Sequence, residues 1–367
     1  MNFFKEYSSN TIGAGANQSF FYPEKKRTGL AFFKILAAGE YHYSLLFSDT
    51  IDSTYADGSF SRANMNAGGY RIESLSVFRC KDLPCKNRVS EWNPSEAKAL
   101  SSVDLTFNGE RGVTIPEGGT VFTDAVKLYF DKGDYIAIRI TYEGKRVPSH
   151  PESMLPLYNK TAEGWEYSVD MPLPLMIGCN RPVKGRIAYL GDSITQGIGT
   201  GYNTYLHYCA IFADLIGDEY SHYNLGIGYA RAADAASRGA WLERAKTCDT
   251  VFLCLGTNDV AHDEDGAESI AKNLRTIIDE LKTADCRVIL QTAPPFDRVG
   301  VRRERWFELN RIIREELSLR ADWLFDNVPL LRLSEEEPEK ARYNGHPNPE
   351  GCLVWANAMY EELKSLF

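Results

Sequence analysis

The chain has 367 residues, of which 44% are hydrophobic and 25% are charged, a balance typical of a soluble globular protein. This length predicts two domains, because a single domain has roughly 100–200 residues. The formal net charge of -9 argues against a nucleic-acid partner, because bound phosphates must be neutralised by Lys and Arg. The sequence contains no stretch of about 18 apolar residues, so we expect no membrane partner.

The N-terminus and the cysteines indicate the cellular compartment in which we expect the protein. The first residues lack a basic segment followed by an apolar stretch, so no secretory signal is visible and we expect a cytoplasmic protein. The eight Cys are scattered, and several lie in apolar runs, as Cys254 does, which favours buried free thiols. Cys80 and Cys85 are close in sequence, but no second Cys or His pair follows them, so we expect no metal and no other cofactor.

The first 180 residues are predicted to be all-β. Their strand-like runs are short, rich in aromatic and β-branched residues, and separated by Gly, Asp, Asn and Pro: residues 31–35, 41–47, 74–78 and 135–142. Many short strands without helices predict two packed sheets, a sandwich that is jelly-roll-like. We expect residues 1–180 to form an accessory or substrate-binding domain. Three roles remain open for it: binding polysaccharide, contributing a loop to the active site, or self-association into a homo-oligomer.

The pattern changes near residues 178–182, a plausible linker, and residues 181–367 are predicted to be an α/β domain. Strands are predicted at residues 186–190, 220–224, 250–255, 287–291 and 323–326. Helices are predicted to follow them at about residues 204–216, 230–246, 266–284, 302–319 and 349–365. Five such alternations with nearly continuous apolar strands predict a five-stranded parallel sheet covered on both faces. Ligands of such sheets bind beyond the carboxyl ends of the strands.

Three of these strand ends carry residues suited to ester hydrolysis. The loop at residues 191–197 contains Ser193, the loop at residues 224–229 is rich in glycine, and the turn at residues 256–259 contains Asn258. Ester hydrolysis needs a nucleophile, a base, and donors aimed at the developing oxyanion. Ser193 is the candidate nucleophile, and its N–H, a glycine N–H and the Asn258 amide are candidate donors. Alone, each would be read as a helix cap or a turn. Their placement at successive strand ends favours an active site.

The base must be a histidine, and the chain has six. Five of them lie in strand-like, loop or helical contexts with no recurring partner. His346 instead lies in a loop just before the final predicted helix, where Asn348 is a plausible N-cap and Pro349 suits the first helical turn. This position predicts that His346 reaches the same edge of the sheet as Ser193.

The second half resembles the SGNH, or GDSL-type, hydrolases, which are esterases and lipases with a flavodoxin-like sheet. Four blocks match in order over about residues 183–367: residues 191–195, 224–228, 256–259 and 346–351. The resemblance implies that Ser193 is the nucleophile and His346 the general base. It also implies an oxyanion hole formed by the Ser193 N–H, a glycine N–H and the Asn258 side chain.

Two positions depart from the family pattern. The family usually has an Asp three residues before its His, and Tyr343 stands there. Either a backbone carbonyl or Tyr343 orients His346, which gives a Ser–His dyad, or an acid comes from elsewhere, with Asp326 as one candidate. The family's oxyanion glycine would fall at Tyr229. A loop shortened by one residue makes Gly228 the best match, whereas an unshortened loop leaves the Tyr229 N–H as the donor.

A β-sandwich before an SGNH domain with a Ser–His dyad is similar to carbohydrate esterases that deacetylate xylan or other sugars. We therefore predict a serine esterase that removes small acyl groups, chiefly acetyl, from small-molecule or oligosaccharide esters through an acyl-enzyme intermediate. Tyr202, Tyr229 and Phe296 either line its pocket or pack within loops. The alternatives are a lipase or thioesterase acting on longer acyl chains, and a carbohydrate-binding protein whose hydrolase domain has lost activity.

Overall fold

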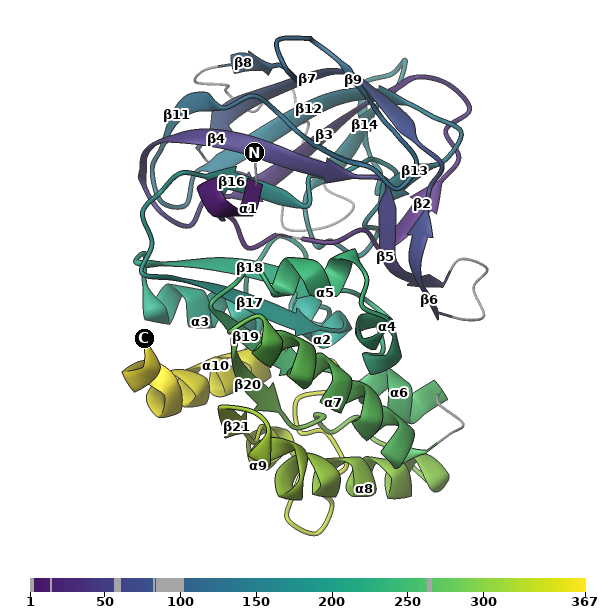
Figure 1. Ribbon diagram of the computed structural model, residues 1–367, viewed down its shortest axis with the longest axis vertical. Helices are drawn as coiled ribbons and strands as arrows, with labels where there is room; N and C mark the ends of the chain where they lie inside the picture. The colour runs from purple at the N-terminus through teal and green to yellow at the C-terminus, as the bar shows by residue number, and fades with distance from the viewer. Residues whose placement is uncertain (1–2, 14, 56–60, 82, 84–101, 263–265) are drawn as a thin grey trace.

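The computed structural model describes residues 3–13, 15–55, 61–81, 83, 102–262 and 266–367. A β-rich N-terminal half lies on top of an α/β C-terminal half, and helix α1 (Phe3–Glu6) lies between the two (Figure 1). The last strand of the upper half ends at Cys179, and the first strand of the lower half begins at Gly185. Cys85, one of the two closely spaced cysteines, lies outside the described residues.

The N-terminal half consists mainly of two antiparallel sheets. The first contains β1 (Ser8–Ser9), β16 (Met176–Cys179), β4 (Gly39–Ser48) and β10 (Thr120–Phe122) in that order, with β11 (Val126–Phe130) also paired to β4. The second contains β15 (Trp165–Tyr167), β14 (Leu157–Lys160), β3 (Arg27–Lys34), β12 (Tyr135–Glu143), β7 (Tyr70–Cys80) and β8 (Ser102–Leu105), with β9 (Val113–Ile115) paired to β7. Two ribbons pair β2 (Ser19–Phe21) with β13 (Val147–Ser149), and β5 (Thr50–Tyr55) with β6 (Ser61–Asn66).

These two sheets share one hydrophobic core. On β4, the alternate residues Tyr43, Leu45 and Phe47 point to the same face of the sheet and are fully buried. They pack in the same cluster as Phe33 of β3 and Ile138 of β12, which belong to the other sheet. The expectation that this half is built mainly of strands is confirmed. The jelly-roll description stays a prediction.

The C-terminal half contains the predicted five-stranded parallel sheet. Its strands are β17 (Gly185–Gly191), β18 (Tyr220–Gly226), β19 (Thr250–Cys254), β20 (Arg287–Gln291) and β21 (Trp323–Phe325). Their order is β18-β17-β19-β20-β21, and all four pairings are parallel. This order is that of flavodoxin-like sheets. It places the carboxyl ends of β17, β18 and β19 side by side.

Helices cover both faces of this sheet. Ile187 and Tyr189 of β17 pack with α3 (Tyr208–Ile216) and α10 (Pro349–Leu363). Ala188 and Leu190 face the opposite side. That side is covered by α4 (Ala232–Ala236), α5 (Ala240–Ala245), α7 (Ala267–Thr283) and α8 (Val301–Glu315). Among the described residues, no helix has the length and apolar character needed to cross a membrane.

The helices differ from the sequence prediction in two ways. The helix predicted at residues 230–246 is interrupted between α4 and α5, where Arg238 adopts a φ of 59° that a right-handed helix cannot contain. Among the described residues, four short α-helices were not predicted: α1, α2 (Ser193–Gln196), α6 (Thr257–His262) and α9 (Val328–Leu331). Each spans little more than one turn, too short for a helical apolar stripe to be recognised in the sequence.

The two halves are joined by a buried interface. Phe3 and Met176 from the first half pack in the same hydrophobic cluster as Leu225 and Trp241 from the second. The Asp52 carboxylate on β5 lies 2.6 Å from the Arg244 guanidinium on α5, and their side chains are 0% and 6% exposed. This shared core links the two parts closely. The division into domains at residues 1–180 and 181–367 stays a prediction.

Removing one partner of the buried ion pair tests this interface. Arg244→Ala is expected to lower the free energy of unfolding by about 3–5 kcal/mol, because Asp52 would remain buried and uncompensated. Urea-induced unfolding measures the change. The control is Arg320→Ala, which removes an exposed pair with Asp279 at 3.1 Å and should cost about 1 kcal/mol or less. Equal effects of the two substitutions would contradict the prediction.

Candidate active site

Ser193 lies in a tight turn between β17 and α2. A Cβ on Gly191 would overlap Thr195 Oγ1 and would lie 2.8 Å from the carbonyl oxygen of Cys254, so this position requires glycine. Asp192 is the N-cap of α2, and its carboxylate accepts a hydrogen bond of 3.0 Å from the Ile194 N–H. The turn thus places Ser193 at the first position of the helix, at the carboxyl end of the strand.

His346 meets Ser193 at this edge of the sheet. The distance from Ser193 Oγ to His346 Nε2 is 2.8 Å, which is a hydrogen bond. The expected N-cap is confirmed, because the Asn348 side chain accepts a hydrogen bond of 2.9 Å from the Gly351 N–H, and Pro349 is the first residue of α10. The Asn348 N–H also donates to the Tyr343 carbonyl at 3.0 Å, which closes the loop that carries His346.

The imidazole of His346 is held by close packing. The Phe296 ring contacts it edge to face, with ring centroids 5.1 Å apart and an angle of 78° between the planes. A Cβ on Gly345 would lie 2.9 Å from this Phe296 ring. Gly199, with a φ of 99°, passes close on another side, and a Cβ there would lie 2.7 Å from the His346 carbonyl oxygen. Both glycines are therefore needed for the position of His346.

No carboxylate orients this imidazole within the part of the chain that the structure describes, where Nδ1 of His346 has no hydrogen-bond partner. Asp326 is engaged elsewhere: it lies 2.8 Å from Arg314 and accepts a hydrogen bond of 2.9 Å from Thr292 Oγ1. The hypothesis that Asp326 supplies the missing acid is therefore wrong. The Tyr343 carbonyl is also engaged elsewhere, because it accepts a hydrogen bond from the Asn348 N–H.

The charged group that acts on His346 is a cation, Arg298. Burial lowers the pKa of His346 below its ordinary value, and the positive charge of Arg298 lowers this pKa further. The Arg298 guanidinium lies 4.6 Å from the centroid of the Phe296 ring, and its Nη2 donates to the Thr257 carbonyl at 2.8 Å. Sequence reasoning missed Arg298. The loop that contains Arg298 follows β20 and lies at the same edge of the sheet as the other three loops. This position was the signal from which Arg298 could have been identified as a site residue.

The three predicted loops are hydrogen-bonded to one another. The Ile227 N–H, next to Gly228, donates to the Gly191 carbonyl at 3.1 Å, which joins the glycine loop to the turn of Ser193. Asn258 Nδ2 donates to the Ala230 carbonyl at 3.0 Å, which joins the third loop to the second. A carboxamide nitrogen carries two hydrogens, so Asn258 keeps one donor for a ligand. The structure therefore brings Ser193, Gly228 and Asn258 to one rim.

The three aromatic residues considered as pocket walls have different positions. Tyr202 is 6% exposed, and its hydroxyl accepts a hydrogen bond of 3.1 Å from the Leu157 N–H, so it packs against the N-terminal half. Phe296 contacts the imidazole of His346. Tyr229 is 50% exposed and adopts a φ of 67° in the glycine loop. A pocket-lining role for Tyr202 is therefore wrong.

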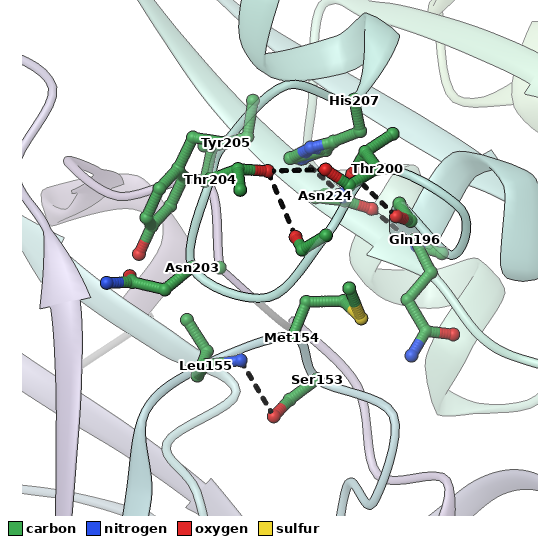
Figure 2. Close-up of a pocket in the computed structure, with 15 residues that line it drawn as sticks. Ser153, Met154, Leu155, Gln196, Thr200, Asn203, Thr204, Tyr205, His207 and Asn224 are labelled. Atoms are coloured by element: carbon green, nitrogen blue, oxygen red, sulfur yellow. Dashed lines mark hydrogen bonds between the residues drawn. The ribbon is translucent and has the colours of Figure 1, made fainter. Parts of the chain in front are cut away.

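A separate cavity lies between the two halves, lined in part by Gln196 of α2. Figure 2 shows Ser153, Met154 and Leu155 of the first half facing Gln196 and His207 of the second. Its volume is about 20 Å³, room for about one water molecule, and neither Ser193 nor His346 lines it. Burial lowers the pKa of His207 to about 4, so this imidazole is neutral at pH 7. The cavity is too small for an ester substrate.

Comparisons with known proteins agree with this arrangement in the second half. Residues 189–352 match the GDSL-like Lipase/Acylhydrolase family. A search of curated proteins returns no match. A solved structure assigned to the G-D-S-L lipolytic family, from Desulfitobacterium hafniense DCB-2, is 17% identical with a TM-score of 0.41, and the match covers 48% of this chain and 98% of that one.

Two further solved structures are similar to about half of the chain. A carbohydrate acetylesterase family member from Sinorhizobium meliloti is 13% identical with a TM-score of 0.42, covering 49% of this chain and 98% of that one. An acetyl xylan esterase is 23% identical with a TM-score of 0.39, covering 48% of this chain and 99% of that one. The family match includes Ser193, Gly228, Asn258 and His346. Residues 189–352 are therefore a GDSL-like lipase/acylhydrolase domain, and this family match makes the protein a carboxylic ester hydrolase.

Proposed function

We propose that Ser193 is the nucleophile and His346 the general base of a serine esterase. The observation that carries this proposal is the hydrogen bond of 2.8 Å between Ser193 Oγ and His346 Nε2. In the first step, Ser193 Oγ attacks the ester carbonyl while His346 Nε2 takes its proton. His346 then returns the proton to the leaving alcohol, and an acyl-enzyme remains. A water molecule, deprotonated by the same imidazole, releases the acid and restores Ser193.

The oxyanion formed in each step requires fixed donors. We propose the N–H groups of Ser193 and Gly228 and the Nδ2 of Asn258 for this role. Each such donor typically contributes about 10²–10³-fold to kcat, because it is already in place when the charge develops. The hydrogen bonds that link the three loops support this assignment, since they hold the donors without rearrangement.

A base without a carboxylate partner needs another source of orientation. In a complete triad, the acid orients the imidazole and stabilises the imidazolium, with an effect of about 10⁴ in kcat. Here we propose that Phe296 and the backbone at Gly199 supply the orientation by packing. The positive charge of Arg298 destabilises the imidazolium and lowers the pKa of His346. The imidazole therefore becomes a neutral base at a lower pH than it would in a triad.

For the substrate, we propose acetyl esters of carbohydrates, with residues 1–180 as an accessory, jelly-roll-like domain. Support comes from the order of the two halves, a strand-rich half before a hydrolase half, which resembles that of carbohydrate esterases. The groups that flank the Ser193–His346 pair also favour a small acyl group, because Arg298 and Asn258 are polar. A long apolar chain laid against them would remove water from these groups without replacing its hydrogen bonds.

Covalent labelling tests the nucleophile. A fluorophosphonate probe is expected to label the wild type, and Ser193→Ala is expected to abolish labelling and to lower kcat on p-nitrophenyl acetate by about 10⁴-fold or more. Ser237→Ala, a substitution of an exposed serine in the same half, is the matched control and should keep both properties. Labelling that persists in Ser193→Ala contradicts the assignment. A folded wild type that is neither labelled nor active would favour the binding-protein alternative.

The pH profile tests the base. His346 must be neutral to accept a proton, so kcat/KM rises as pH rises through its pKa. Because burial and Arg298 lower this pKa, the midpoint of the acidic limb is expected below pH 6.5. Arg298→Gln removes the positive charge and should move the midpoint to higher pH, whereas Arg302→Gln, on the exposed start of α8, should not. A midpoint that stays fixed in Arg298→Gln would show that Arg298 does not act on the base.

The length of the acyl chain separates the proposal from a lipase or thioesterase. With p-nitrophenyl esters, kcat/KM is expected to fall by about tenfold or more from acetate to octanoate, since the longer chain must desolvate Arg298 and Asn258. Steady-state kinetics on the two esters under identical conditions give the ratio. A preference for octanoate would support the lipase alternative.

A further inference from the structure

One carboxylate of the N-terminal half, that of Glu152, contacts the glycine loop of the site. Glu152, in the segment between β13 and β14, lies so close to Gly228 that a Cβ on this glycine would overlap Glu152 Oε2. The same Cβ would lie 2.6 Å from Nε2 of Gln18, another residue of the first half. Glu152 therefore occupies the space that a side chain at position 228 would need, so this position requires glycine.

Residues of both halves hold Glu152 in place. Gln18 Nε2 donates to Glu152 Oε2 at 2.5 Å and to the Gly228 carbonyl at 3.4 Å, while the Glu152 N–H donates to Gln18 Oε1 at 3.2 Å. From the second half, the side-chain amide of Gln196 donates to the Glu152 carbonyl. Gln18 and Gln196 are 6% and 5% exposed. Such buried supporting hydrogen bonds are what hold a binding group in a fixed geometry.

One oxygen of this carboxylate remains open to a ligand. Within the described residues, Oε1 of Glu152 accepts no hydrogen bond and no Lys or Arg forms an ion pair with the side chain, which is partly exposed. An ionised carboxylate is an acceptor only, so its free oxygen can bind a hydroxyl through a short, charge-assisted hydrogen bond. It repels an anion. A carboxylate in this position therefore favours a neutral partner that carries hydroxyl groups.

An exposed aromatic residue follows Gly228 in the chain. Tyr229 follows Gly228 directly, and its side chain is 50% exposed. An amphipathic aromatic ring offers an apolar face against which the C–H face of a sugar can pack. A fixed carboxylate against Gly228 and an exposed aromatic residue at the next position of the glycine loop are complementary to a ring that carries hydroxyls on its edge and hydrogens on its face.

We propose that Glu152 binds a hydroxyl of the alcohol part of the substrate, next to Tyr229, so that the N-terminal half selects esters of polyhydroxylated rings. The inference rests on the proposed function, because it assigns the alcohol side of that same site. Glu152 is the specificity-determining residue. Gln18 acts through Glu152 and is a positioning residue.

Two acetate esters of six-membered rings, one with ring hydroxyls and one without, test this inference. Methyl 2-O-acetyl-β-xylopyranoside offers hydroxyls to Glu152, and cyclohexyl acetate offers none. The wild type is expected to show a kcat/KM at least about tenfold higher for the sugar ester, the range of one charge-assisted hydrogen bond. Glu152→Gln keeps the shape but removes the charge, and it should lower this ratio by about tenfold, mainly through KM. Glu110→Gln, an exposed glutamate between β8 and β9, is the control and should leave the ratio as it is.

Each other outcome overturns the inference. A ratio unchanged in Glu152→Gln, or an equal loss on both esters, would mean that Glu152 only joins the two halves. If Glu152→Gln does not fold, the wild type decides: methyl β-xylopyranoside should inhibit hydrolysis of cyclohexyl acetate more strongly than cyclohexanol does, and equal inhibition contradicts the proposal. The proposed function fails separately, if the wild type hydrolyses neither ester or if hydrolysis survives Ser193→Ala.

Discussion

The close approach of the chain to itself at the end of β17 is the constraint on which the site depends. Gly191 leaves no room for a Cβ between Thr195 and the Cys254 carbonyl, and its own carbonyl accepts the Ile227 N–H at 3.1 Å. One glycine thus joins the turn of Ser193 to the neighbouring strand and to the glycine loop. A larger residue would separate these segments, and the proposed nucleophile and its proposed oxyanion donors would no longer share one rim.

The position of His346, the proposed base, follows from packing rather than from a carboxylate. Phe296 contacts the imidazole of His346, and glycines at positions 199 and 345 let the backbone and the Phe296 ring approach it. Packing of this kind fixes the direction of Nε2 toward Ser193 without adding a negative charge. The charge that acts on the imidazole comes from Arg298 and is positive, so burial and electrostatics both keep His346 neutral. In this respect the site differs from a triad, in which an acid stabilises the imidazolium.

The first half of the chain is part of the architecture around the site. Its hydrophobic residues share a core with the parallel sheet, and the buried pair of Asp52 and Arg244 joins the two halves at 2.6 Å. These contacts hold the segment around Glu152 against Gly228, so a residue far away in the sequence reaches the candidate oxyanion loop. The alternative that a loop of the first half contributes to the active site agrees with this contact.

The sequence by itself determined the α/β half, because its signals are local: apolar strands alternate with helical stripes, and Ser193, Asn258 and His346 lie in short blocks at strand ends. It also indicated the strands of the first half, although not the strand order, which depends on pairings between distant segments. Only the tertiary structure decided what surrounds His346. Asp326 binds Arg314, and Arg298 and Phe296 converge on His346 from a loop that carries no recognisable motif. Glu152 likewise has no local signal, since its contact with Gly228 exists only when the two halves pack together.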